Sequence, residues 1–449
     1  MGVIAVARRA GRGLGFAGMI PKTQCGHCAG GIEFEAEPPG QSQASGDGTT
    51  QRKETRMKKY FSIQLAKPAM QLSLGALALG ICLAAVHPAL AQPALSIATT
   101  NQQAILFWTN STATNYVLQS STNLASTNWV FATDALPATD GSDTALTISN
   151  GSTVRFFRLI SLPATTTDGM ALIPAGWFTM GDTLDGDGDA IPKNIYVSAF
   201  YMDTNLVSYS QWQTVYNWAT NHGYGFDNAG AGKAGNHPVQ MLNWYDCVKW
   251  CNARSQQAGR MPVYYTDAGM TQVYTNGNPA AVYVNWAVSG YRLPTEAEWE
   301  KAARGGLSGQ RFPWGDTISW SQANYYGDPL SLDPSGYAYD LATAVGYDPA
   351  YNDRVYPYTS PVGSFAANGY GLYDMAGNVL EWCWDWYGTP YGQPTTTNPT
   401  GPASGSIRMV RGGGWGYFAI YCRAAGRDNS DPAYTNFNLG FRSVLPPGL

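Results

Sequence analysis

The sequence predicts an α+β domain that is irregular and rich in loops, preceded by a small all-β module. Three segments with helical periodicity and capping residues lie in the central part of the 449-residue chain. After Gly306 the chain continues as short apolar runs separated by Gly, Pro, Asn and Asp, a pattern that indicates loops and short strands. Before Pro163, short β-rich runs alternate with Ser, Thr, Asn and Gly, which favours a separate β module.

The all-β module is expected over 93–163. The runs expected to form its strands are 104–108, 116–120, 129–132, 145–148 and 155–160. Short strands at this spacing favour a β-sandwich, and the pattern resembles a fibronectin-type-III-like module. It contains no recognisable catalytic constellation, so a spacer or adhesion role is expected. The stretch 163–169 is the predicted linker to the second domain, 169–449.

Local start and stop signals define the three helices of the second domain. The expected helices are 209–219, 244–253 and a third that follows the capping box 295–298. Ser208 and Asn243 are suited to cap the first two, since their side-chain oxygens accept from the first free backbone N–H groups. The third helix is expected to end at Gly305, because glycine readily adopts the left-handed conformation that closes a helix. Upstream of all three, 170–180 is consistent with two strands about a turn.

Composition limits the function classes. Charged residues make up 13% of the chain, about half the usual share for soluble domains. The net charge is −4 and no basic block is present, which argues against nucleic-acid binding through phosphate contacts. With 15 Trp, 28 Tyr and 51 Gly, the chain suits a loop-rich core held by large rings and tight turns. The same composition suits an exported protein.

An export signal is expected at Met57 rather than at Met1. Two lysines follow Met57, then an apolar run over 72–86 and an A-x-A cleavage site at 89–91. This is the layout of a signal peptide, here 57–91. The apolar run is short for a membrane span, so we expect a secreted, periplasmic or cell-surface protein with no span after cleavage. Residues 1–56 are then upstream sequence or a disordered leader, with a genuine long leader as the alternative.

A series of motifs in the second domain matches one family in order. The motifs are 170–181, 237–251, 291–306 (YRLPTEAEWEKAARGG), 312–315, 368–386 (with GLYDMAGNVLEWCWDW at 371–386) and 411–442. Together they resemble the formylglycine-generating enzyme, or sulfatase-modifying factor, family over roughly residues 170–444. The resemblance implies a divergent C-type-lectin-like α+β fold.

The resemblance also implies two calcium sites made of side-chain oxygens and backbone carbonyls, the ligands that this hard cation prefers. The first set is Asp374, Gly377, Val379 and Glu381. The second set, which crosses an insertion, is Asn324, Tyr325, Asp353 and Val355. The alternative for both sets is that these residues bond backbone amides in turns. A further acidic stretch, 185–189 (DGDGD), lacks the later Gly and Glu of an EF-hand, so a solvated acidic turn is expected there.

The family reaction converts a substrate cysteine to formylglycine with copper and oxygen, and two cysteine thiolates bind the soft Cu(I) ion. The family spacing places these ligands at Tyr417 and Cys422, so only one of them is a cysteine here. Gly414 takes the place of a serine, and Leu380 takes the place of an active-site tryptophan. One thiolate and one phenol make a poor Cu(I) site. We therefore expect the copper site, and with it the oxidase reaction, to be lost.

The remaining cysteines leave alternatives open. Cys383 would restore a thiolate pair only if the fold placed it beside Cys422. Otherwise these two residues are small buried hydrophobes or a disulfide pair. Cys247 and Cys251 are four residues apart on one expected helix and are interpreted as packing residues.

The sequence thus predicts an exported, calcium-stabilised domain that binds a peptide or a glycan in a cleft beside Tyr417 and Cys422. Aromatic side chains suit stacking on sugars or extended peptides. The alternative is a formylglycine-generating oxidase with a divergent site that acts on sulfatase cysteines, and a third possibility is a structural surface protein. The ligand and the oligomeric state are not defined by the sequence.

Overall fold

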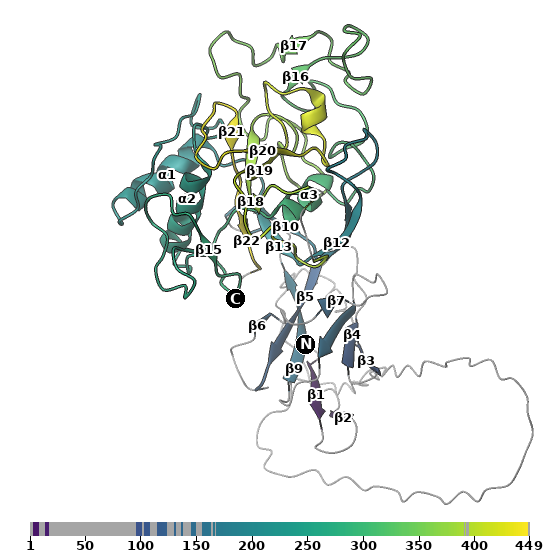
Figure 1. The fold of residues 1–449 in the computed structure, drawn as a ribbon. Coiled ribbons are helices and arrows are strands. Elements are labelled where there is room, and N and C mark those ends of the chain that lie inside the picture. The colour runs from purple at the N-terminus through teal and green to yellow at the C-terminus, as the bar shows by residue number, and fades with distance from the viewer. Residues whose placement is uncertain are drawn as a thin grey trace, which may run out of the picture. The chain divides into compact units, whose positions relative to one another are not determined.

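The protein was analysed as a computed structural model (Figure 1). It describes residues 165–166, 168–389, 391 and 395–447, together with these shorter stretches: 3–8, 14–17, 96–100, 103–107, 115–123, 130–131, 136–137, 145–149 and 155–162. The chain divides into two compact units, of which the second takes in Ser161–Leu449. The expected signal peptide, 57–91, lies outside the described residues. Within the described part of the chain, no helix is both long and apolar enough to span a membrane.

Nearly all described residues of the first unit lie in strands. They are β1 (Val3–Arg8), β2 (Leu14–Ala17), β3 (Ser96–Thr100), β4 (Gln103–Phe107), β5 (Asn115–Ser121), β6 (Val130–Phe131), β7 (Leu136–Pro137), β8 (Ala145–Ser149) and β9 (Arg155–Leu162). They form two sheets, in the orders β3-β4-β8-β7 and β2-β1-β9-β5-β6. The five expected runs coincide with β4, β5, β6, β8 and β9. Strands β1 and β2 fall within 1–56, whose origin stays a prediction.

The three helices of the second unit are confirmed. They are α1 (Tyr209–Thr220), α2 (Trp244–Gln257) and α3 (Glu296–Arg304). The Ser208 side chain caps α1 by accepting from the Gln211 N–H, and both α2 and α3 begin with a complete capping box. Gly305 closes α3 in the left-handed conformation, with φ 58°. Because these signals are local in sequence, the helix positions follow directly from them.

The strands of the second unit are short. They are β10 (Met170–Ile173), β11 (Gly176–Met180), β12 (Lys193–Val197), β13 (Phe200–Asp203), β14 (Tyr264–Tyr265), β15 (Tyr283–Val284), β16 (Tyr326–Gly327), β17 (Gly346–Tyr347), β18 (Leu380–Trp386), β19 (Arg408–Arg411), β20 (Asp428–Ser430), β21 (Leu439–Gly440) and β22 (Val444–Leu445), with a 3-10 helix, η1 (Ala419–Cys422). The two larger sheets have the orders β10-β13-β22 and β20-β19-β18-β21. The segment 170–180 does contain two strands, but β10 pairs with β13 and β11 with β12, so they belong to different sheets.

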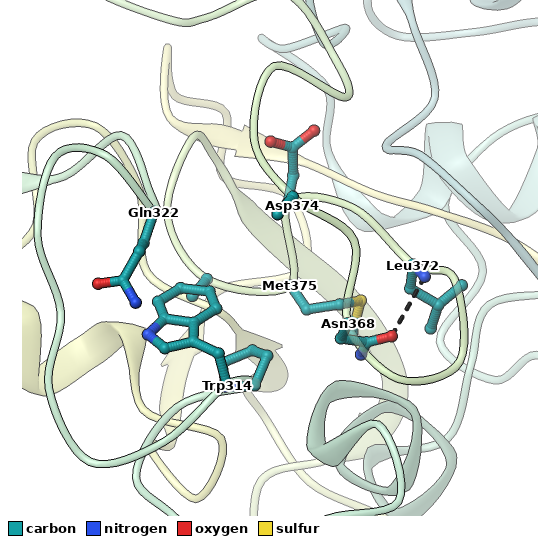
Figure 2. A pocket seen from close by; sticks show the side chains of 9 residues that line it. Trp314, Gln322, Asn368, Leu372, Asp374 and Met375 are labelled. Atoms are coloured by element: carbon teal, nitrogen blue, oxygen red, sulfur yellow. Dashed lines mark hydrogen bonds between the residues drawn. The ribbon is translucent and has the colours of Figure 1, made fainter.

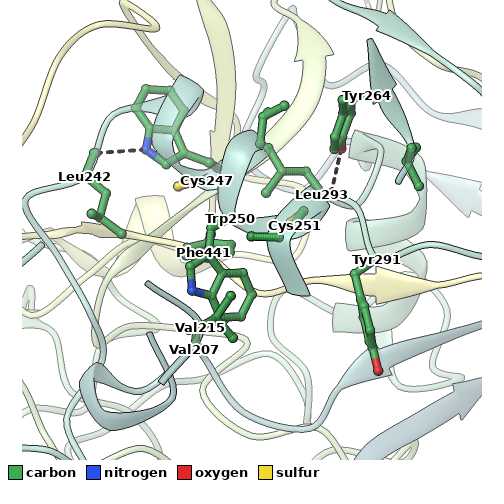
Figure 3. Close-up of a cluster of buried hydrophobic side chains, with 14 of the residues drawn as sticks. Val207, Val215, Leu242, Cys247, Trp250, Cys251, Tyr264, Tyr291, Leu293 and Phe441 are labelled. Carbon is green, nitrogen blue, oxygen red and sulfur yellow. Dashed lines mark hydrogen bonds between the residues drawn. The ribbon is translucent and has the colours of Figure 1, made fainter. Parts of the chain in front are cut away.

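The central strands of this unit lie between α1 and α2 on one side and α3 on the other (Figure 1). One large cluster of buried side chains joins α1 and α2 to β18 and the C-terminal strands. Figure 3 shows Cys247 and Cys251 within this cluster, close to Trp250 and Phe441. Both cysteines are completely buried, and burial raises the pKa of each thiol. Their interpretation as packing residues is confirmed.

Buried ion pairs link helices α2 and α3 to strands and to the segment that precedes α3. Arg411 donates to Glu300 at 2.5 Å, Arg292 to Glu298 at 2.6 Å and Arg254 to Asp203 at 2.8 Å. Buried charges persist only when they are paired in this way.

The expectation of a solvated acidic turn at 185–189 is wrong. The Asp185 carboxylate accepts from Arg423 at 2.8 Å and from Arg311 at 3.2 Å, and Asp187 also pairs with Arg423. The Asp185 side chain is only 12% exposed. Both arginines are distant in sequence. The tertiary fold therefore pairs these carboxylates with arginine side chains, which the sequence around the turn does not indicate.

Candidate functional site

The turn that precedes β18 has an unusual backbone. Asp374, Gly377 and Asn378 all adopt positive φ, at 54°, 81° and 64°. Non-glycine residues rarely adopt this conformation, and where they do it often marks a functional or tightly constrained segment. A Cβ on Gly377 would lie 2.4 Å from the carbonyl oxygen of Asn324, which also accepts from the Asn378 N–H at 2.8 Å. The turn therefore places the first expected calcium set beside the start of the second.

Glu381 is buried and fully engaged by protein groups. Its Oε2 accepts from Arg442 Nε at 2.7 Å and from Trp299 Nε1 at 2.9 Å, and its Oε1 accepts from Arg442 Nη2 at 2.9 Å. The positive partner of this carboxylate is therefore Arg442. As arranged here, Glu381 does not fit the role of a calcium ligand.

Asp374 differs from Glu381 because half of its carboxylate has no partner. Its Oδ2 accepts from the Gly363 N–H at 2.7 Å, but its Oδ1 is buried without a hydrogen bond. Burial raises the pKa of this carboxyl to about 6. Asn205 Oδ1, also buried without a partner, lies 2.9 Å from where a Cβ on Gly363 would sit. Two unsatisfied oxygens beside Gly363 fit the neighbourhood of a hard cation.

Residues of the second expected set already accept hydrogen bonds from protein donors. Asn324 and Tyr325 are buried, whereas Asp353 and Val355 are exposed. The Tyr325 carbonyl accepts from Trp320 Nε1 at 3.1 Å. The Lys233 ammonium group donates to Asp353 Oδ1 at 2.7 Å and to the Val355 carbonyl at 3.1 Å. These residues do not fit a calcium site.

Cys422 is a buried thiol at the end of η1. It packs in a cluster with Phe312, Ala376 and other apolar side chains, and its surface is completely covered. A Cβ on Gly413 would lie 2.6 Å from its sulfur, so the backbone closes over it at that point. Burial raises the pKa of the thiol to about 12. At neutral pH the group is therefore a protonated thiol and not the thiolate that binds metals or attacks electrophiles.

Tyr417, at the other position of the expected pair, is half-buried. Its ring packs edge-on against Tyr421 at 5.3 Å between centroids. Burial raises the pKa of its phenol to about 12. At neutral pH its oxygen is therefore a neutral hydroxyl.

Cys383 does not complete a pair with Cys422. It belongs to a different cluster of buried side chains, with Trp299 and Ala424, and burial raises the pKa of its thiol well above the usual value. All four cysteines after Ala91 are free thiols, so a disulfide between Cys383 and Cys422 is excluded and both are small buried hydrophobes. Across the described residues, no group of three or more His, Cys, Asp and Glu side chains is arranged to hold a metal ion.

Leu380, at the position where the resemblance places an active-site tryptophan, is a core side chain. It is 2% exposed and packs into the same large cluster as Trp212 and Phe441. An aliphatic core side chain therefore stands at this position.

The sequence analysis missed a continuous series of aromatic rings, here named the aromatic row. In order, the row consists of Phe437, Tyr356, Trp415, Tyr358, Tyr347, Tyr326, Phe418 and Tyr337. Successive ring centroids are 4.8 to 6.4 Å apart. Tyr356, Phe437 and Phe418 are 56%, 43% and 40% exposed. The frequency of Tyr and Phe after Gly306 is the only sequence signal, since the rings come from separate segments.

The row passes close to Tyr417 and continues toward a shallow pocket. The Tyr326 N–H donates to the Tyr417 carbonyl at 2.9 Å. Beyond Tyr337 the ring contacts continue through Tyr339 and Phe312 to Trp314.

The pocket is a hollow of about 220 Å³ that is open to solvent. Its lining is Pro313, Trp314, Gln322, Ala366, Asn368, Leu372, Asp374, Met375 and Ala376. Figure 2 shows Trp314 and Gln322 on one side of it and Asp374 and Met375 on the other. Neither Tyr417 nor Cys422 lines it, so this hollow is not the cleft that was expected beside those two residues.

Comparison with known proteins gives the family. Residues 157–446 match the model of the sulfatase-modifying factor enzyme 1-like domain. The chain is 33% identical to a formylglycine-generating enzyme of Mus musculus over 293 residues, which are 61% of this chain and 74% of that protein. It is also 33% identical to the chaperone protein LppX of Paenibacillus barcinonensis, over 56% of this chain and 80% of that protein. The solved structure of Treponema denticola variable protein 1 matches 62% of this chain and 95% of its own, with 29% identity and a TM-score of 0.46. The chain belongs to the sulfatase-modifying factor family and has its α+β, C-type-lectin-like fold.

Proposed function

We propose that this member of the sulfatase-modifying factor family is an exported binding domain that holds a peptide or a glycan on its aromatic row. The observation that carries the proposal is the row itself, with three exposed rings backed by half-buried ones. Ring faces and edges contact sugars and extended peptides over a large apolar area, while tyrosine hydroxyls supply hydrogen bonds. The low charge of the chain, at 13%, suits an uncharged ligand.

The state of Cys422 argues against copper oxidation. A Cu(I) site requires thiolates, and this thiol is buried with its pKa raised to about 12. Cys383 packs elsewhere, and Tyr417 offers a phenol. The second candidate function is a formylglycine-generating oxidase with a divergent site, which is favoured by the relatives that carry this name. It would require Cys422 to become exposed and ionised during the reaction.

Calcium is part of the proposal, at the first set only. Asp374 offers an unsatisfied carboxylate oxygen, and the carbonyls of Gly377 and Val379 belong to the same turn. These three residues would hold the ion, with Glu381 paired to Arg442 behind them. Bound calcium would rigidify the turn and offset the cost of burying Asp374 as a charged group.

A binding screen tests the proposal. The mature protein, beginning after Ala91, is applied to parallel arrays of neutral glycans and cysteine-containing peptides. A ligand found there is then titrated against Tyr356→Ala and against Trp286→Ala, a control ring that is 43% exposed but lies outside the row. We expect about tenfold or greater weakening for Tyr356→Ala alone. Equal affinity in both variants would overturn the assignment of the row as the binding surface.

A further inference from the structure

Lys233 binds two of the four residues that the family resemblance assigns to the second calcium ion. Its ammonium group donates to Asp353 Oδ1 at 2.7 Å and to the Val355 carbonyl at 3.1 Å. A calcium ion would need the same two oxygens at about 2.3–2.6 Å, so it would compete with the ammonium group for them. We infer that Lys233 is a built-in replacement for the second calcium ion and holds the loop 353–358 without metal.

The surroundings of Lys233 suit a permanent cation. Its side chain is 17% exposed, whereas that of Asp353 is 51% exposed, so the lysine reaches the exposed carboxylate from a largely covered position. The face of Tyr358 lies 6.0 Å from Nζ and adds a weak attraction. A calcium ion would have to displace a covered side chain and overcome the repulsion between two cations. The oxygens therefore already have the cation that they require.

A second lysine shows the same arrangement elsewhere in this unit. Lys249 is completely buried, and its Nζ lies 3.5 Å from Asp246 Oδ1 and 3.9 Å from Asp227 Oδ1. The Gly277 carbonyl is a further 3.5 Å contact. Here too a lysine ammonium group occupies a set of carboxylate and carbonyl oxygens. The fold thus uses lysine as an internal cation at more than one place.

Lys233 belongs to a segment that braces the whole loop region 353–362. The Val362 N–H donates to the Asn236 carbonyl at 2.8 Å, and the His237 ring bonds to Thr359 Oγ1 at 2.9 Å. The braced loop carries Tyr356 and Tyr358 of the aromatic row. Lys233 is accordingly a positioning residue for the row. That last step rests on the proposed function, whereas the replacement of calcium does not.

Hydrogen exchange of the peptide that covers 353–358 tests the inference. It is measured on the full mature protein with excess calcium and with EGTA, for the wild type, for Lys233→Met and for Asp374→Ala, which removes the calcium site proposed at the first set. We expect the same exchange in calcium and EGTA for Asp374→Ala. In Lys233→Met we expect exchange to be about two- to fivefold faster, the range for a partly exposed ion pair. Asp353→Asn breaks the same ion pair at its exposed residue and should give the same result. It serves as the test if Lys233→Met does not fold.

The matched control is Arg354→Met, which removes a neighbouring cation of the same loop and leaves both Lys233 bonds in place. It should exchange as the wild type does. The double variant Lys233→Met/Asp353→Asn should exchange no faster than either single variant, since both remove one interaction. Calcium-dependent slowing of this peptide in Asp374→Ala would overturn the inference, as would unchanged exchange in both Lys233→Met and Asp353→Asn. Ligand binding is not measured, so the result is independent of the proposed function.

Discussion

The aromatic residues and the cysteine of segment 412–422 differ in their exposure to solvent and in their chemical reactivity. Trp415 and Phe418 join the aromatic row, and Phe418 is 40% exposed. Four residues after Phe418, Cys422 is completely covered, with its thiol held in the protonated form. A nucleophile or metal ligand has to be accessible and ionised, whereas a stacking surface only has to be exposed. The comparison supports the proposal that the aromatic row, and not Cys422, is the functional part of this segment.

The sharpest way to break the comparison is to measure thiol reactivity in both parts of the segment. Native Cys422 should react with a small thiol reagent about a thousandfold or more slowly than in the unfolded chain, because burial both covers the sulfur and suppresses the thiolate. The engineered variant Phe418→Cys should react rapidly in the native state. Mass spectrometry of labelled peptides separates the sites. Rapid native labelling at Cys422 would mean that the sulfur is accessible after all.

Glu381 lies on β18, which pairs with the strand that precedes segment 412–422. Removing its charge should have the next largest effect, a loss of domain stability. Glu381→Gln leaves Arg442 buried without a counter-charge and should destabilise the domain by about 3–5 kcal/mol. Asp353→Asn, which breaks an exposed pair, should cost no more than about 1 kcal/mol. Urea unfolding followed by tryptophan fluorescence measures both changes. Similar losses for the two variants would contradict the role given to the buried pair.

Calcium should act through Asp374 and not through Asp353. At a free calcium concentration about a hundredfold above Kd, the ion should stabilise the wild type by about 2.7 kcal/mol relative to EGTA. Asp374→Ala, which removes the side-chain oxygens, should lose most of this gain, while Asp353→Asn should keep it. The difference in Tm with and without calcium gives the answer. If Asp374→Ala keeps the full gain, the ion binds elsewhere.

A smaller effect is expected from pH on hydrogen exchange of the loop 353–362, which His237 contacts. The pKa of His237 is lowered, first by burial and then by the nearby Lys233 charge. When loop 353–362 detaches from His237, the imidazole regains its ordinary pKa and binds a proton more readily. The attachment of the loop is therefore less stable as pH falls through about 6.5. Exchange of 353–362, corrected for its intrinsic rate, should be faster at pH 5.5 than at pH 7.5. In His237→Gln this difference should shrink, and an undiminished difference would assign the effect to another group.

The parts of the molecule that follow from local signals could be predicted from the sequence. Ser208, Asn243 and Thr295 fixed the helix starts because a cap involves only its own first turn. The fold could also be predicted, because the family motifs and their order can be read directly along the chain. The expected loss of the thiolate pair rests on the identity of Tyr417 in the sequence, and it stays a prediction.

What could not be predicted depends on partners distant in sequence. Lys233 is 120 residues from Asp353, so nothing near Asp353 signals that its carboxylate already has a cation. Arg423 is 238 residues from Asp185, which is why the acidic turn was misinterpreted. The aromatic row likewise joins rings from β16, β17, the loop at Tyr356 and the C-terminal segment, and only the fold brings them together.

The most direct test of the account is the family reaction itself. The mature protein is incubated with copper, oxygen and a cysteine-containing sulfatase-motif peptide, and the peptide is examined by mass spectrometry for conversion of the cysteine to an aldehyde. The account predicts no aldehyde with the wild type and no difference in Cys422→Ser. Aldehyde formed by the wild type and lost in Cys422→Ser would contradict it and establish the oxidase function instead.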